Sequence, residues 1–80
     1  MMPGVERLWV IFKDSVTIEE ARELIASHPE LKIKHEVWDT IKAFTVIVPD
    51  GQAELWEERL ENEEMVSSTH VLLTEAAYEV

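Results

Sequence analysis

Apolar and polar residues alternate along several segments of this chain, and the first such segment is residues 7–13. Because successive side chains of a strand point in opposite directions, one side of this segment carries Leu8, Val10 and Phe12. The other side carries Trp9 and Ile11. Two apolar sides favour a strand in the middle of a sheet. We therefore predict a central strand here.

A helical pattern follows after a short connection. Thr17 and Glu20 have the Ser/Thr-x-x-Glu spacing of a capping box, in which each side chain accepts a hydrogen bond from the backbone N–H of the other residue. Beyond it, apolar residues recur on one stripe, at Ile18, Ala21, Leu24 and Ile25. Pro29 disfavours helical geometry in the residue before it. These signals predict a helix that starts at residue 18 and ends near Ser27 or His28.

Two further alternating segments are separated by Asp39 and Thr40, which are typical turn residues. In the first segment the pattern places four residues on one face: Leu31, Ile33, His35 and Val37. Charged residues occupy its other face, as suits an edge strand: Lys32, Lys34 and Glu36. In the second segment Phe44, Val46 and Val48 alternate with Ala43, Thr45 and Ile47. We expect the two segments to pair as a hairpin.

A second helix and a fourth strand complete the pattern. Pro49 ends the third strand because it has no N–H for a ladder, and Asp50 suits a helix N-cap. The helix is expected over residues 52–61, with a buried stripe of Ala53, Trp56 and Leu60. Residues 65–74 have mixed polarity and are expected to form the last strand.

The resulting βαββαβ order predicts an α+β, ferredoxin-like fold: a four-stranded antiparallel sheet with two helices on one face. Right-handed crossovers place the first and third strands at the centre of the sheet. We expect one domain over residues 1–80, with a folded core over residues 6–74 and a C-terminal tail over residues 75–80.

Composition narrows the classes of function. The formal net charge is −10, and the second half of the chain is the more acidic, with Arg59 as its only base beyond residue 48. Such a field repels phosphate, so we expect neither nucleic-acid nor membrane binding. The absence of cysteine fits a reducing compartment, and the first residues do not resemble a signal peptide. We expect a cytoplasmic monomer, with a vacuolar or secreted target left open.

Few residues of this sequence are candidates for catalysis or for metal or phosphate binding. The three histidines, His28, His35 and His70, match no metal-binding spacing and are expected at a helix end and at the sheet margins. A catalytic acid–base pair needs a water-poor cleft, whereas the carboxylates of this sequence fall on predicted outer helix faces. The serines lack a nucleophile motif, and Gly4 and Gly51 are too few for a phosphate-binding loop. We therefore expect a binding module with no catalytic residues, no metal and no cofactor, rather than an enzyme.

Four motifs resemble the inhibitor I9 family, which comprises subtilisin propeptides and stand-alone inhibitors such as the fungal proteinase A and B inhibitors. They are VIFKDSVT at residues 10–17, IKHE at 33–36, IKAF at 41–44 and VIVPD at 46–50. Together with the acidic helix after the first motif, the similarity covers residues 7–73. It implies inhibition of a subtilisin-like serine protease, or assistance in its folding as an intramolecular chaperone.

The resemblance also implies two contact regions. The C-terminal tail would enter the active-site cleft like a bound product, through Ala76, Ala77, Tyr78, Glu79 and Val80. The exposed sheet face would dock on the protease, through Trp9, Ile11, Ala43, Thr45, Ser67 and Thr69. An extended tail can gain main-chain hydrogen bonds by adding to the edges of a substrate-binding site.

The fourth strand departs from the family pattern. Relatives carry an acidic cluster there that caps helices of the protease, whereas this chain has Ser67, Ser68, Thr69 and His70. Neutral acceptors lack the charge contribution of about 0.3–1 kcal/mol per group at a helix N-terminus. An alternative is therefore a ferredoxin-like interaction or self-assembly module that does not inhibit proteases.

Overall fold

Six elements follow one another in the predicted βαββαβ order in the computed structural model, which describes residues 6–72. Their bounds are β1 (Arg7–Phe12), α1 (Ile18–Ala26), β2 (Lys32–Trp38), β3 (Lys42–Ile47), α2 (Ala53–Glu61) and β4 (Val66–Leu72). The predicted end of the fourth strand, residues 73 and 74, lies outside the described residues.

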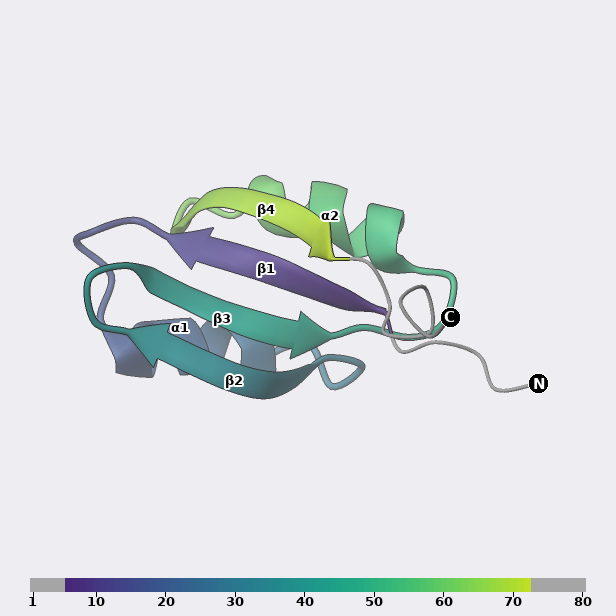
Figure 1. The fold of residues 1–80 in the computed structure, drawn as a ribbon, viewed down its shortest axis with the longest axis horizontal. Helices are drawn as coiled ribbons and strands as arrows, with labels where there is room; N and C mark the ends of the chain where they lie inside the picture. Colours follow the sequence, from purple (N-terminus) through teal and green to yellow (C-terminus); the bar gives the residue numbers. More distant parts are fainter. Residues whose placement is uncertain (1–5, 73–80) are drawn as a thin grey trace, which may run out of the picture.

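The strands form one antiparallel sheet in the order β2-β3-β1-β4, so β1 and β3 are central and β2 and β4 are the edges. Both helices lie behind the sheet as it is seen in Figure 1, with α1 behind β2 and α2 behind β4. This arrangement confirms the predicted α+β, ferredoxin-like fold and leaves the other sheet face without a helix.

The core lies between the sheet and the two helices. The predicted alternation of β1 is confirmed, since Leu8, Val10 and Phe12 are buried against the helices. Phe44 and Trp56 are the largest fully buried side chains of this layer. The rest of the buried apolar cluster comes from α1, β3, α2, β4 and the connecting loops: Val16, Ala21, Leu24, Ile25, Leu31, Val46, Val48, Ala53, Leu60 and Val66.

The first helix begins as its sequence predicts. The Thr17 hydroxyl accepts a hydrogen bond from the Glu20 N–H at 3.1 Å, and the Glu20 carboxylate accepts one from the Thr17 N–H at 3.0 Å. Ser27 is the C-cap, and its hydroxyl donates to the Leu24 carbonyl. The capping box therefore sets this start locally, without help from the rest of the fold.

The face prediction for β2 is wrong in part, because a β-bulge interrupts the strand at Lys34. Ile33 pairs with Val46 on the helix side, whereas the next paired residue is His35, opposite Thr45 on the other side. An extra residue in one strand turns the following side chains to the opposite face. Ile33 and Val37 therefore lie on different faces, although their spacing in the sequence is even.

The same bulge gives Trp38 a role that the alternation did not predict. Its ring lies on the helix side, with centroids 5.7 Å from Phe12 and 5.4 Å from Phe44. Lys42, at the start of β3, lies over the Trp38 ring at 5.7 Å and donates hydrogen bonds to the carbonyls of Asp14 and Val16. The β2–β3 hairpin thereby closes one end of the core and anchors the loop before α1.

The predicted N-cap of the second helix is also wrong. The N-cap is Gln52, and its side chain makes no capping bond. A carboxylate oxygen of Glu6 instead accepts hydrogen bonds from the N–H groups of Gly51 and Ala53. The start of α2 is therefore stabilised by a residue from the other end of the chain, next to β1, and not by Asp50.

Candidate functional site

The sheet face opposite the helices carries three rows of side chains, which we call the open face. Strand pairing places His35, Thr45, Trp9 and His70 in the middle row, in that order across all four strands. One flanking row is Val37, Ala43, Ile11 and Ser68, and the other is Lys32, Ile47, Arg7 and Leu72. Trp9 thus stands near the centre of a surface that neither helix of residues 6–72 covers.

The docking residues that the sequence predicts on this face differ in how exposed their side chains are. Trp9 and Ile11 are partly exposed, whereas Ala43 is fully buried and Thr45 is 6 % exposed. The two small residues lie in β3 between larger side chains of β1 and β2, which cover them. Contact with a partner would therefore be made by the larger neighbours.

The residues of β4 that lie on the open face differ from those predicted. Thr69 pairs with Val10 on the helix side and is 1 % exposed, so it is not part of the open face. A register shift near Phe12 leaves Ser67 exposed but unpaired, and Ser68 is the residue opposite Ile11. The prediction of Thr69 as a surface residue is therefore wrong, because alternation in β4 turns its side chain into the core.

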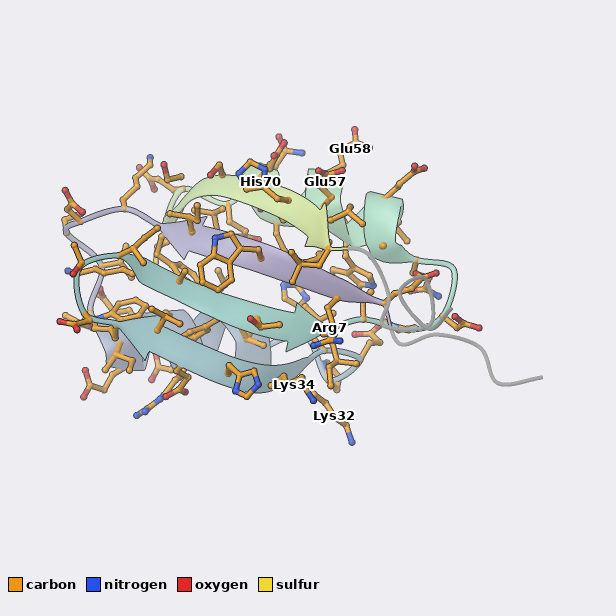
Figure 2. All side chains as sticks on the ribbon, viewed as in Figure 1. Arg7, Lys32, Lys34, Glu57, Glu58 and His70 are labelled. Carbon is orange, nitrogen blue, oxygen red and sulfur yellow. The ribbon has the colours of Figure 1, made fainter. Side chains whose placement is uncertain are left out.

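The open face is locally basic in an acidic protein. None of its twelve row positions is Asp or Glu, and they include Lys32, Arg7 and two histidines. Figure 2 shows Arg7, Lys32 and Lys34 together at one end of the sheet. The carboxylates of the described chain instead lie on the helices, the loops and the helix side of β2, and this separation of charge gives the two sides of the molecule different electrostatic character.

An exposed ion pair joins the helix layer to the edge of the sheet. Arg22 of α1 donates two hydrogen bonds to the Glu36 carboxylate of β2, at 2.8 Å from Nε and 2.6 Å from Nη2. The hydrogen bonds from Arg22 lower the pKa of Glu36, and the same bonds raise the pKa of Arg22. This bidentate pair fixes α1 against β2 and lies away from the open face.

Other features of the described residues lie away from the open face. An open depression of about 380 Å³ lies beside the loop before α1 and is lined by Lys13, Ser15, Val16, Glu20, Glu64 and Met65. Residues 6–72 contain no group of three or more His, Asp or Glu side chains arranged to hold a metal ion. His28 packs edge-on against Trp56, with ring centroids 5.1 Å apart. Within the same range, neither helix has the length and hydropathy needed to cross a membrane.

The predicted cleft-binding tail, Ala76, Ala77, Tyr78, Glu79 and Val80, lies outside the described residues. The last described residue of β4, Leu72, stands in the same row as Arg7 and Ile47 at one end of the open face.

No protein-family model, curated protein or solved structure was found to match this chain.

Proposed function

We propose that this protein inhibits a subtilisin-like serine protease by docking its open face on the protease and placing its C-terminal tail in the active-site cleft. The observation that carries the proposal is the position of Leu72. Because Leu72 is the last described residue of β4 and lies within a row of the open face, the chain continues toward the tail from the border of the docking surface. A partner bound to the face is therefore within reach of the tail.

The size of the open face also supports a two-part contact. Four strands about 4.8 Å apart, each with about five residues of 3.3 Å, cover roughly 300 Å². A stable protein–protein interface buries about 800 Å² on each partner. The outline of the face is thus modest for an interface, and residues 73–80, which can extend over roughly 26 Å, would add a second contact.

Binding through both regions raises the effective concentration of the tail at the cleft. A folded domain thus turns a weakly binding peptide into an inhibitor. The family resemblance of the motifs at residues 10–17, 33–36, 41–44 and 46–50 supports the same assignment.

The proposal is tested by inhibition assays of a purified subtilisin with the full chain and with a chain ending at Thr74. We expect the shorter chain to inhibit at least about tenfold more weakly, which corresponds to ~1.4 kcal/mol. Equal inhibition by the two chains, or no inhibition by either at micromolar concentration, would contradict the tail-in-cleft mechanism.

A matched pair of variants tests the docking face separately. Ile11→Lys places a charge on the open face, in the central strand β1, whereas Leu55→Lys places the same charge on an exposed position of α2. We expect Ile11→Lys to weaken inhibition and Leu55→Lys to leave it unchanged, provided that both variants keep the circular dichroism spectrum of the parent. Equal effects of both would show that the open face is not the docking surface.

A further inference from the structure

The two edges of the sheet differ in how they are protected. An edge strand presents main-chain N–H and C=O groups that can pair with another strand, and charged side chains or bulges normally prevent this. The edge strand β2 has both, with exposed Lys32 and Lys34 and a bulge at Lys34. The edge strand β4 carries no charged residue and no proline between Val66 and Leu72, and its own irregularity is confined to Ser67, so that residues 68–72 pair regularly with β1. The free edge of β4 is therefore the one open to strand addition.

One hydrogen bond shows which groups of β4 point outward. The Thr69 N–H donates to Oε2 of Glu61 at 3.3 Å and so points away from β1, although Thr69 is opposite Val10 in the ladder. In an antiparallel pair such outward groups recur at every second residue. The N–H of Val71 is therefore turned to the same free edge, while His70 between them pairs with β1.

The Glu61 carboxylate lies at the free edge of β4. Its oxygen accepts the outward N–H of Thr69 from the end of α2, in the place where a carbonyl oxygen of an added strand would lie. The same helix carries three more glutamates, Glu54, Glu57 and Glu58, at the helical spacing that puts them on one side with Glu61. We call these four residues the α2 acidic stripe.

The α2 acidic stripe runs beside the free edge of β4. Glu61 reaches Thr69 directly, and Figure 2 shows Glu57 and Glu58 at the β4 side of the molecule. The single base of α2, Arg59, lies over the Trp56 ring at 5.1 Å, on the side away from this edge. An extended chain on β4 would therefore have carboxylates along one flank.

From these observations we infer that the free edge of β4 binds an extended basic peptide by strand addition. Main-chain hydrogen bonds with Val71, and with Thr69 once a carbonyl of the peptide replaces Glu61 as acceptor of its N–H, hold the added strand, and its Lys or Arg side chains pair with the α2 acidic stripe. A second copy of this chain does not fit, because pairing β4 with β4 would bring two acidic stripes together in chains of net charge −10. The edge is separate from the open face, so this inference does not depend on protease inhibition.

Binding is tested by nuclear magnetic resonance on the full ¹⁵N-labelled chain with a synthetic peptide of about eight residues in which Lys and Val alternate. We expect amide shifts at Thr69, His70 and Val71, and none along β2. A peptide with Glu in place of Lys, and the Lys peptide N-methylated at every second residue, should both leave the spectrum unchanged. The inference is overturned if shifts map to β2 or the open face, if the N-methylated peptide binds equally, or if no shift appears at millimolar peptide.

Two kinds of variant separate main-chain pairing from charge. Val71→Pro removes one outward N–H without breaking a bond to β1, and proline is tolerated on such edge positions. We expect it to abolish the shifts while the protein stays folded. Should it fail to fold, the double variant Glu57→Gln and Glu58→Gln still tests the edge, with an expected loss of affinity of about threefold or more that shrinks at high salt.

The matched control is the double variant Glu19→Gln and Glu23→Gln, which removes the same charge from the exposed side of α1. It should bind the Lys peptide like the parent. Equal weakening by the α1 and α2 double variants would mean that only the overall charge of the protein attracts the peptide, and would overturn the assignment to β4.

Discussion

Glu6 and Gly51 lie 45 residues apart in the sequence, yet Oε1 of Glu6 accepts the Gly51 N–H at 3.0 Å. The same oxygen accepts the Ala53 N–H at 3.2 Å. Gly51 has a φ of +79°, a backbone conformation that favours glycine and that turns its N–H toward β1. A carboxylate at this end of α2 also interacts favourably with the partial positive charge of the helix N-terminus. The contact therefore ties the second helix to the first strand.

We expect Glu6→Ala to lower the free energy of unfolding by about 1 kcal/mol, because it leaves two N–H groups at the start of α2 without this acceptor. Glu6→Gln keeps an acceptor oxygen and should lose less. Urea unfolding followed by circular dichroism measures both. Glu30→Ala, at an exposed acid outside the helices, is the control, and a Glu6→Ala variant as stable as this control would show that the cap contributes nothing.

The Arg22–Glu36 pair predicts a pH dependence. Because Arg22 lowers the pKa of Glu36, the folded state holds this proton less tightly than the unfolded state does. The pair therefore stabilises the fold above the ordinary Glu pKa of 4.5, and this contribution is lost as the pH falls through the lowered value. Arg22→Met should return the pKa of Glu36 toward 4.5 in a carboxyl titration by nuclear magnetic resonance. Arg59→Met, on the other helix, should leave that pKa unchanged.

Thr69→Val should stabilise the protein or leave its stability unchanged. The Thr69 hydroxyl is buried and has no hydrogen-bond partner among the described residues, so its desolvation is not compensated. Valine has nearly the same shape and carries no polar atom, and such a replacement is expected to gain up to about 1 kcal/mol. Thermal unfolding measures the change. A clear loss of stability would indicate that the hydroxyl makes a bond that this packing does not explain.

Trp38→Ala should destabilise the fold by about 2–3 kcal/mol, since it removes a large ring from a three-ring cluster with Phe12 and Phe44. The nearby control is Ile41→Ala in the same hairpin, because Ile41 is 40 % exposed and should cost less than about 0.5 kcal/mol. Denaturant unfolding compares the two. Similar costs would mean that Trp38 is not part of the core.

Local patterns predicted the elements well where a local signal existed. The Thr17–Glu20 capping box and the alternation of β1 both appear in the structure as expected. The local patterns failed where more than one residue could fill the same position at similar local cost. Asp50 is a good N-cap by type, but the carboxylate that reaches the helix end belongs to Glu6, which only the folded chain brings there.

On the open face, too, local patterns predicted some residues correctly and missed others. The pairing of Trp9 with Thr45 and of Ile11 with Ala43 follows from period-two alternation in two central strands. The edge strands were harder, because bulges occur mainly where a strand has a neighbour on one side only. The bulge at Lys34 brings His35 and Val37 onto the open face, and the register shift in β4 places Ser68 there instead of Ser67.

By itself, the sequence determined the order of elements, the antiparallel sheet and its central strands, because alternation, caps and turns act over a few residues. Tertiary structure alone decided which side chains the edge strands expose, that Thr69 is buried, and that Glu61 meets the outward N–H of Thr69. These contacts join residues from separate elements, and their geometry depends on strand register and helix packing, which no local pattern specifies.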